Sequence, residues 1–260
     1  MGVLNVTPDS FSDGGAYLEP DAAVARAERM AEEGAAILDI GGESTRPGAL
    51  GVDGEEELRR VLPVVERVAV RLPLVISVDT SNPELMRRAG AAGAHMINDA
   101  RALRRPGALE AVAAGTLGVC LMHMRGEPAD MQRDPQYRDV VAEVRDYLAQ
   151  RALACTTAGI GRERLCLDPG FGFGKSTAHN LQLLRHLEQF TELGAPLAVG
   201  LSRKSLVSAL TGRAAGERLA GSLALATVAV LLGARIVRAH DVAASVDAVR
   251  VASALRRKGV

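Results

Sequence analysis

The 260-residue sequence predicts a single-domain (β/α)8 barrel, and three observations support this fold. Short apolar segments alternate with amphipathic segments along the whole chain. The apolar segments are unbroken runs, without alternating polar residues, which is typical of parallel strands buried on both faces. No linker, low-complexity run or block of charge marks a second domain. We therefore expect residues 1–260 to form one barrel, with an open doubly wound sheet as the structural alternative.

The strands are expected in the short apolar runs. Several of these runs follow a Gly-Ala pair, and the glycine suits the left-handed residue that ends a helix. A polar residue then stands where the run ends. The eight predicted strands are Met1–Val6, Ala36–Ile40, Leu74–Asp79, Met96–Asp99, Gly118–Met122, Leu165–Leu167, Leu197–Gly200 and Ile236–Ala239.

Helices are expected in the amphipathic segments between these strands. The clearest examples are Asp21–Glu33, Glu55–Arg71, Asp139–Ala158 and Gly216–Leu232. Strict alternation of strand and helix over eight units, at this chain length, is the form expected of a (β/α)8 barrel.

Composition excludes several classes of function. Lys plus Arg equals Asp plus Glu at 31 each, so no net field draws the molecule to nucleic acid or to a membrane surface. Aromatic residues make up 3% of the chain and Trp is absent, which argues against a base-stacking platform. The longest apolar stretch, Leu223–Ala234, is too short and too rich in Ala to span a membrane.

The three cysteines, Cys120, Cys155 and Cys166, lack the spacing of a metal site. We expect buried free thiols, which indicate a reducing compartment. The start of the chain has no basic region of the kind that opens a secretory signal. The sequence therefore predicts a cytoplasmic protein.

Polar side chains stand at or just beyond the end of nearly every predicted strand. In a (β/α)8 barrel these strand ends and the loops after them form one rim, where the functional groups gather. Any one such residue could instead be a helix cap, although Thr80, Ser81 or Asn82 is better placed than Asp79 to cap the helix after Pro83. The residues expected on the rim are Asn5, Asp39, Asp79, Asn98, Asp168, Lys204, Arg238 and His240.

Asp79, Asn98 and Asp168 would offer fixed acceptors and one amide donor inside a mostly apolar funnel. Such a set suits a flat heterocycle that carries several N–H groups. The glycines between Asp168 and Lys175 would let the backbone lie close over a bound ring. Phe173 could form one wall of this site or pack in the core.

The segment Gly174-Lys175-Ser176 imitates the end of a phosphate-binding P-loop. The first glycine of that motif would fall at Pro169, which has no backbone N–H to offer a phosphate, so a nucleoside triphosphate site is excluded. Better candidates for anion binding are Ser202–Ser205, which follows a strand and opens a helix, the pair Arg238 and His240, and Arg46 in a glycine-rich loop. His123 is close to the rim, and its role stays open.

No cluster of His, Cys and Glu has the spacing of a zinc site. Asn5 could give one neutral oxygen to Mg²⁺, an ion that keeps several waters and leans on substrate phosphates. Thr7–Gly15, the polar loop after the first strand, suits ligand capture. The Gly-x-Ser-x-Gly nucleophile motif is absent, so covalent catalysis is not expected.

With these residues identified, the whole chain resembles the dihydropteroate synthase family of folate biosynthesis. The resemblance implies a (β/α)8 barrel that condenses 6-hydroxymethyl-7,8-dihydropterin diphosphate with 4-aminobenzoate and releases pyrophosphate. The motifs that carry it are Asn5–Gly15, Gly41–Gly48, Ser77–Thr80, Asn98-Asp99, Leu121–Met124, Asp168–Lys175, Ser202–Ser205 and Arg238–Asp241.

The resemblance also implies roles for individual residues. Asp79, Asn98, Asp168 and Lys204 would hold the pterin. Arg238 and His240, with Thr45, would bind the diphosphate, and Asn5 would meet its Mg²⁺. The catalytic set would be Asp79, Asp168, Lys204, Arg238 and His240. The residues implied around 4-aminobenzoate, where sulfonamides compete, are Phe11, Thr45, Arg46, Pro47, Phe173 and Ser202. A homodimer formed through the late helices is implied as well.

Two features depart from the family pattern. The chain begins inside the first strand, where the family has residues upstream, so we expect a misplaced start or a missing lower closure. Ala100 stands where the family carries a larger apolar residue, which predicts a looser pterin pocket. The alternatives are a pterin-binding methyltransferase domain, which needs no diphosphate site, and a catalytically silent paralogue, which would lack rim residues.

Overall fold

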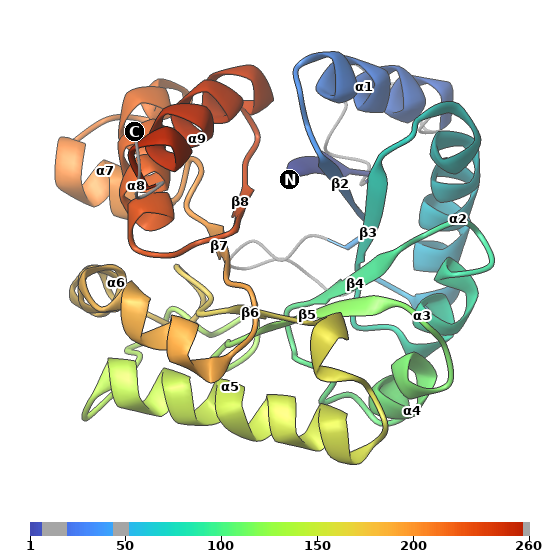
Figure 1. Ribbon diagram of the computed structural model, residues 1–260, viewed down its shortest axis with the longest axis horizontal. Helices are drawn as coiled ribbons and strands as arrows, with labels where there is room; N and C mark the ends of the chain where they lie inside the picture. Colours follow the sequence, from blue (N-terminus) through green and yellow to red (C-terminus); the bar gives the residue numbers. More distant parts are fainter. Residues whose placement is uncertain (7–19, 44–51, 257–260) are drawn as a thin grey trace.

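The computed structural model describes residues 1–6, 20–43 and 52–256, and these residues form a closed barrel of parallel strands surrounded by helices (Figure 1). Strands and helices alternate along the chain. The strands are β1 (Gly2–Asn5), β2 (Ile37–Gly41), β3 (Val75–Asp79), β4 (Met96–Asp99), β5 (Gly118–Met122), β6 (Leu165–Asp168), β7 (Ala198–Gly200) and β8 (Ile236–Arg238). The helices are α1 (Pro20–Glu32), α2 (Gly54–Arg71), α3 (Pro83–Ala89), α4 (Ala108–Ala113), α5 (Val140–Thr157), α6 (Thr177–Arg185), α7 (Ser205–Thr211), α8 (Leu219–Leu231) and α9 (Val242–Arg256).

Backbone contacts between strands close the barrel. Strands β1 to β6 pair in sequence order as one parallel sheet, and β7 pairs with β8. A parallel bridge between Leu167 and Leu197 joins β6 to the segment before β7, and a bridge between Gly2 and Ala239 joins β8 back to β1. The Val3 amide donates to the Ala239 carbonyl at 3.1 Å. The predicted barrel is therefore confirmed, and the open-sheet alternative is wrong.

The repeated Gly-Ala unit has the predicted conformation. Gly34, Gly93 and Gly233 each end a helical segment with φ between 93° and 112°, in the left-handed range where a side chain is strained. The chain then enters a strand within a few residues. These glycines turn the chain sharply from the outer helices into the inner strands.

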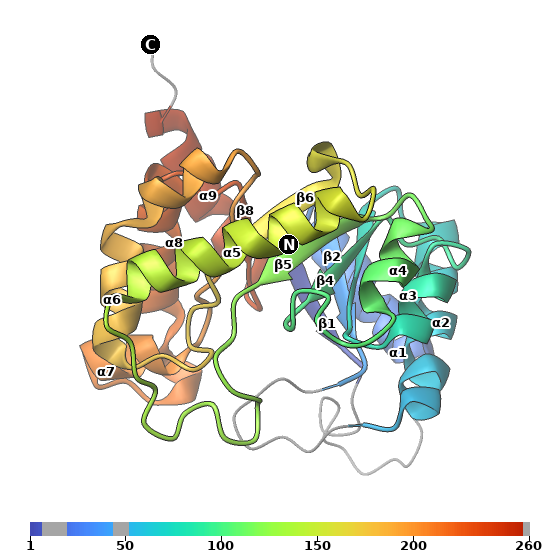
Figure 2. The ribbon, with the colours of Figure 1, turned by 90° about the horizontal axis from the view of Figure 1, so that it is seen from below.

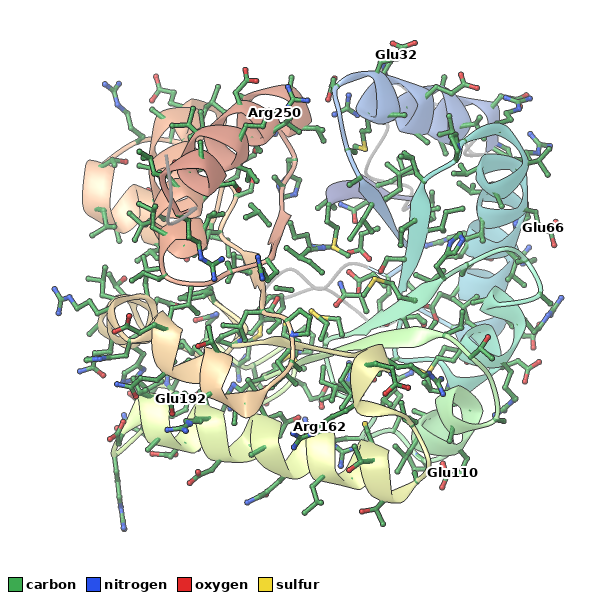
Figure 3. The ribbon with its side chains drawn as sticks, in the orientation of Figure 1. Glu32, Glu66, Glu110, Arg162, Glu192 and Arg250 are labelled. Carbon is green, nitrogen blue, oxygen red and sulfur yellow. The ribbon has the colours of Figure 1, made fainter. Side chains whose placement is uncertain are left out.

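The helices lie outside the strands, and α5 runs along the barrel wall beside β5 and β6 (Figures 1 and 2). Charged side chains such as Glu66 and Glu192 point outward from this layer (Figure 3). Apolar side chains between the two layers form the main core, which includes Leu38, Ile76 and Leu148, all fully buried. No helix in the described part of the chain is long and apolar enough to cross a membrane.

The predicted element boundaries differ from the observed ones mostly by a single residue. The exception is the expected helix Gly216–Leu232, which is wrong at its start. Residues Ala215–Glu217 form a 3-10 turn, and α8 begins only at Leu219. The N-cap at Arg218 makes no side-chain hydrogen bond to the helix, so no polar cap residue marked this boundary in the sequence.

Inside the barrel, a second apolar cluster closes the end at which the strands begin. Its buried members are Met96, Cys120, Cys166 and Ala198, and Met1, Ile37 and Ile236 pack against them. All three cysteines are free and buried, as predicted. This plug leaves the opposite end, where the strands end, as the place for a ligand.

Candidate active site

The candidate site lies inside the barrel, directly next to the apolar plug and toward the ends of the strands. Successive residues of a strand point to opposite faces, so a residue two positions later returns to the same face. Thus Asn98 follows Met96, Asp168 follows Cys166 and Arg238 follows Ile236. The cavity formed at this level is lined by Asp79, Asn98, Ala100, Met122, Asp168, Phe173, Gly200, Lys204 and Arg238. Six residues predicted to carry the chemistry therefore meet in one place.

Arg238 connects two carboxylates across the barrel. Its Nε donates to Oδ2 of Asp39 at 2.5 Å, and its Nη2 donates to Oδ2 of Asp79 at 2.8 Å. The Asn98 side-chain amide donates to the same oxygen of Asp39 at 3.0 Å. Asp39 is fully buried, and its other oxygen, Oδ1, has no partner among the described residues.

These contacts determine the pKa values of Asp79 and Arg238. Burial raises the pKa of Asp79 to about 7, against the attraction of Arg238, and the neighbouring charge of Asp39 raises it further. Burial by itself would lower the pKa of Arg238, but Asp39 and Asp79 more than offset this and hold it above its usual range. Arg238 is therefore a fixed cation, while Asp79 titrates near neutral pH.

Lys204 faces Asp168 across the cavity. Its Nζ donates to the carbonyl of Phe171 and lies 4.5 Å from the centre of the Phe173 ring. Burial lowers the pKa of Lys204 to about 8, although Asp168 acts in the opposite direction. Burial raises the pKa of Asp168, and the charge of Lys204 opposes that rise. One side of the cavity thus combines a cation, a carboxylate and an aromatic face.

The glycine-rich segment after Asp168 forms one wall of the site. Gly170 and Gly174 have φ of 71° and 63°, and a Cβ atom would meet the carbonyl oxygens of His123 at 1.9 Å and Arg125 at 2.2 Å. The backbone therefore lies directly against the loop that follows β5. The Asp168 carboxylate accepts the Gly170 amide at 2.7 Å, which fixes the turn. This arrangement agrees with the exclusion of a P-loop.

The side chains of the two cationic segments near the rim, Ser202–Ser205 and Arg238–Asp241, point in different directions. In Ser202–Ser205, Lys204 enters the cavity, whereas Arg203 forms an ion pair with Asp241. Ser202 Oγ lies 3.2 Å from both the amide nitrogen and Nδ1 of His240. His240 is therefore held beside the rim by a hydroxyl from the neighbouring loop.

The predicted metal contact has a suitable position. Asn5 ends β1 at the same rim, half-buried, and its side chain makes no hydrogen bond to any described residue. The described residues hold no group of three or more His, Cys, Asp or Glu able to bind a metal ion. Asn5 thus fits an ion such as Mg²⁺, which takes few protein ligands.

Four predicted substrate contacts lie outside the described residues: Phe11, Thr45, Arg46 and Pro47. The sequence gives no separate role to two further side chains at this site, Asp39, which it places on the rim, and Lys175. Asp39 follows Ile37 of the plug on the same strand face, which is the signal that could have identified it. Lys175, which ends the Asp168–Lys175 motif and resembles the lysine of a P-loop, is buried behind the glycine wall.

Comparisons with known proteins agree with this geometry. Residues 1–240 match the family model described as pterin binding enzyme. Dihydropteroate synthase of Escherichia coli K12 is 54% identical over 254 residues, which cover 98% of this chain and 90% of that protein. The Haemophilus influenzae dihydropteroate synthase is 51% identical, with 96% and 91% covered.

Solved structures give the same result. The Xanthomonas albilineans dihydropteroate synthase with 4-aminobenzoic acid has a TM-score of 0.93 and 56% identity, covering 99% of this chain and 93% of that one. The Yersinia pestis dihydropteroate synthase with a sulfonamide drug complex also has a TM-score of 0.93, at 50% identity and with 98% and 93% covered. The chain therefore belongs to the pterin-binding enzyme family and, within it, to the dihydropteroate synthases, which are transferases of folate biosynthesis.

Proposed function

We propose that the cavity above the plug binds 6-hydroxymethyl-7,8-dihydropterin diphosphate by its pterin ring. Asp79, Asn98 and Asp168 would accept from and donate to the edge of the heterocycle, and Lys204 would donate to its acceptors. The observation that carries this proposal is the arrangement of two carboxylates, an amide and a lysine around one small cavity. A structure of the Xanthomonas albilineans relative holds 7,8-dihydropteroate, the pterin product.

The reaction would replace the diphosphate on the pterin methylene with the amine of 4-aminobenzoate. Departure of pyrophosphate leaves positive charge on the methylene, which the electron-rich ring delocalises. Fixed carboxylates beside the ring, Asp79 and Asp168, would stabilise that charge as it develops. The hydrogen bond from Arg238 to Asp39 fixes the guanidinium beside the same cavity, so the cation keeps its position relative to the two carboxylates.

Arg238 and His240 would neutralise the leaving group, with Thr45 as a further contact. Two nitrogens of Arg238 are bonded to Asp39 and Asp79, and Nη1 makes no hydrogen bond to the described residues. Nη1 is therefore the nitrogen that we assign to the diphosphate. Mg²⁺, held through Asn5 and the substrate phosphates, would supply additional positive charge at the leaving group.

Phe173 and Ser202 would form the described part of the 4-aminobenzoate site, with Phe11, Arg46 and Pro47 completing it. The Phe173 ring lines the cavity, with its centre 4.5 Å from Nζ of Lys204. The structures of relatives with 4-aminobenzoic acid and with a sulfonamide drug support a shared subsite for substrate and inhibitor. We therefore expect sulfonamides to compete with 4-aminobenzoate.

Two further properties belong to the proposal. Helix α8 exposes apolar side chains on one face, with Val228 and Leu231 each more than 40% exposed, and we assign this face to a homodimer. The three free cysteines support a reducing environment, and we place the reaction in the cytoplasm.

The experiment that tests the function is a pyrophosphate-release assay with the purified chain. Release should require the pterin diphosphate, 4-aminobenzoate and Mg²⁺ together, and dihydropteroate should form in equal amount. The methyltransferase alternative predicts no pyrophosphate, and a silent paralogue predicts binding of the pterin without release. Release that continues at the same rate without 4-aminobenzoate would also contradict the proposal.

A further inference from the structure

Lys175 is a buried lysine that forms no ion pair with a described residue. Its side chain is 3% exposed, yet its Nζ has four polar neighbours. Nζ donates to the carbonyls of Gly170 at 2.8 Å, Phe173 at 3.0 Å and His123 at 3.3 Å, and it lies 2.9 Å from Nδ1 of His123. Burial lowers the pKa of Lys175 well below its usual range, although Asp168 acts in the opposite direction. Burying an amine is costly, so a residue that only filled space would be expected to be apolar.

The contacts of Lys175 join the glycine wall to the loop after β5. Gly170 and Phe173 belong to the wall, and His123 follows β5, about fifty residues earlier in the chain. The side chain of Asn180 secures the same wall from α6, because its Oδ1 accepts the Gly172 amide at 2.8 Å. Lys175 thus holds the wall from behind, on the side away from the cavity.

Lys204 holds the same wall from the cavity side. Its Nζ donates to the Phe171 carbonyl, its aliphatic chain lies against Gly172, and it sits over the Phe173 ring. Lys204 has three N–H groups and would share them between the wall and a bound pterin. Lys175 serves only the wall and the loop after β5, so its contacts hold Phe173 in the same way with and without the ligand.

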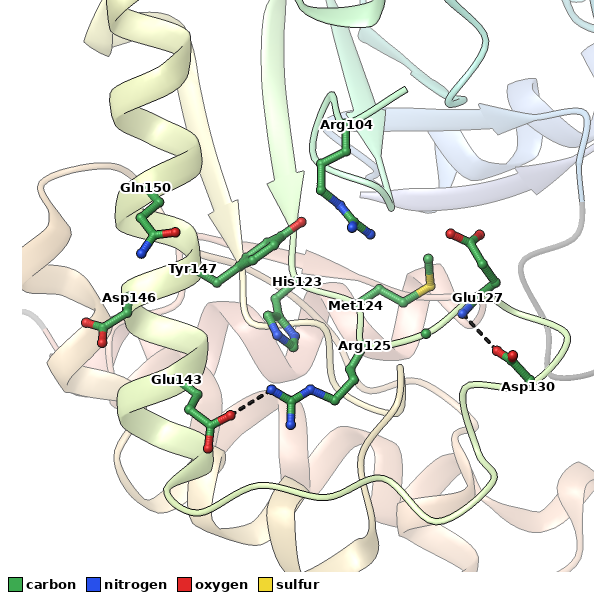
Figure 4. Close-up of a pocket in the computed structure, with 11 residues that line it drawn as sticks. Arg104, His123, Met124, Arg125, Glu127, Asp130, Glu143, Asp146, Tyr147 and Gln150 are labelled. Atoms are coloured by element: carbon green, nitrogen blue, oxygen red, sulfur yellow. Dashed lines mark hydrogen bonds and ion pairs between the residues drawn. The ribbon is translucent and has the colours of Figure 1, made fainter. Parts of the chain in front are cut away.

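The contact with Lys175 also fixes the position of His123. Its ring packs edge-on to Tyr147 of α5, with centroids 4.8 Å apart, and Figure 4 shows both side chains lining one cavity with Arg125. This cavity has a volume of about 620 Å³, and the loop after β5 forms one side of it. Burial lowers the pKa of His123 to about 2, with Lys175 adding to the shift, so the ring stays neutral over the working pH range.

We infer that Lys175 is a positioning residue that sets the place of Phe173 and so the affinity for the aromatic amine substrate. The inference rests on the proposed function, because that function places 4-aminobenzoate against Phe173. Lys175 itself touches neither substrate. It acts through the wall between Gly170 and Phe173.

The first test compares Lys175→Met with the wild type in steady-state kinetics. The KM for 4-aminobenzoate should rise by about tenfold or more, because a displaced wall misplaces the second substrate. The KM for the pterin diphosphate should change much less, since Asp79 and Asn98 lie on other strands. Equal KM values for 4-aminobenzoate in a folded Lys175→Met variant would overturn the inference.

A matched control removes a cation from the opposite end of the barrel. Arg164 donates to the carbonyls of Val112 and Leu117 at 2.7 to 2.9 Å, much as Lys175 does at the rim. Arg164→Met should lower the melting temperature without changing either KM. A similar rise in the KM for 4-aminobenzoate in both variants would show a general loss of stability and would contradict a specific role for Lys175.

A spectroscopic readout tests the inference independently of the reaction. Because the sequence contains no Trp, Phe173→Trp gives a single fluorophore on the wall. Acrylamide should quench this fluorophore more strongly, by about twofold, when Lys175→Met is added, and no more strongly when Arg164→Met is added. If the wild type released no pyrophosphate, the proposed function would fail, and the quenching would still decide whether Lys175 holds the wall.

A second pair of variants covers the case in which Lys175→Met does not fold. His123→Leu removes the ring nitrogen that faces Lys175, and His123→Gln keeps an acceptor at that place. We expect the KM for 4-aminobenzoate to rise in the Leu variant and to return toward the wild-type value in the Gln variant. Equal values in both variants would overturn the inference.

Discussion

Arg238 and Asp39 form an ion pair inside the barrel, with 2.5 Å between Nε and Oδ2. The carboxylate is fully buried, and the guanidinium is 22% exposed toward the cavity. Because Asn98 donates to the same carboxylate oxygen, one buried aspartate orients both the cation and the amide of the candidate site. Asp39 is thus part of the site although it does not line the cavity.

Asp39→Asn should lower kcat/KM by about 30-fold, which corresponds to roughly 2 kcal/mol, because it leaves Arg238 partly buried without its closest countercharge. The loss should be measured with the pterin diphosphate as the varied substrate. Asp21→Asn is the control, since the ion pair between Asp21 and Arg67 is exposed and far from the site. An Asp39→Asn variant as active as the control would show that Arg238 needs no such support.

Asp79→Ala and Arg238→Ala should each lower kcat/KM by about 100-fold or more, close to 2.7 kcal/mol of transition-state binding. The two side chains share a hydrogen bond of 2.8 Å, so the double variant should lose less than the sum of the single losses. A complete double-mutant cycle measures this coupling. Near-wild-type kinetics in both single variants would remove the electrostatic mechanism.

The dependence of kcat/KM on pH should be bell-shaped. Burial raises the pKa of Asp79 to about 7, so the carboxylate that we propose accepts the pterin N–H groups forms only as pH rises through that value. Burial lowers the pKa of Lys204 to about 8, so its positive charge is lost above that value. Activity should therefore rise up to about pH 7 and fall beyond about pH 8.

Two variants assign the limbs of this profile, measured from pH 5.5 to 9.5. Asp79→Asn should abolish the rise on the acid side, because an amide does not titrate. Lys204→Arg should abolish the fall on the alkaline side, because a guanidinium keeps its charge. A profile that keeps both limbs in both variants would assign the titration to other groups.

The strand ends of this barrel could be predicted from sequence because strand periodicity and the position of polar residues are local properties. Asp79, Asn98 and Asp168 were identified in this way, and they do meet in one cavity. The importance of Asp39 was harder to see. It looks like its neighbours at other strand ends, and only the contact with Arg238, 199 residues away, distinguishes it.

Long-range packing also explains why the role of Lys175 could not be predicted. In the sequence it completes Gly-Lys-Ser, which suggests a phosphate contact. In the fold its side chain contacts His123 and does not enter the candidate site. The glycines Gly170 and Gly174 allow the wall to lie directly against the loop after β5, where His123 is found. No pattern within the motif shows which backbone will lie behind it.

Ala100 contributes a small side chain to the lining of the proposed pterin site. This residue is 7% exposed, lines the cavity and packs with Met122, Met124 and Phe173. Ala100→Val should tighten binding of 6-hydroxymethylpterin by up to about tenfold, since two added methyl groups would bury apolar surface against the ring. Isothermal titration calorimetry checks this. Unchanged or weaker binding in Ala100→Val would mean that the pocket already fits its ligand.

The exposed face of α8 should govern the oligomeric state. Val228 and Leu231 are 41% and 43% exposed on a helix that carries no charged residue from Leu219 to Leu231, which is unusual for a surface in water. In sedimentation velocity the wild type should have twice the mass of one chain. Val228→Asp combined with Leu231→Asp should give the mass of one chain, because a buried unpaired carboxylate is costly at an interface.

Val70→Asp is the matched control for this prediction. Val70 on α2 is 89% exposed, so the change adds the same charge to an exposed apolar position on another helix. The control should sediment as the dimer and keep its activity. A wild type that sediments as one chain at micromolar concentration would refute the dimer, and a dimer that survives both α8 substitutions would place the interface elsewhere. Because the cavity is lined from strands and loops of a single chain, the separated protomer should keep its affinity for the pterin.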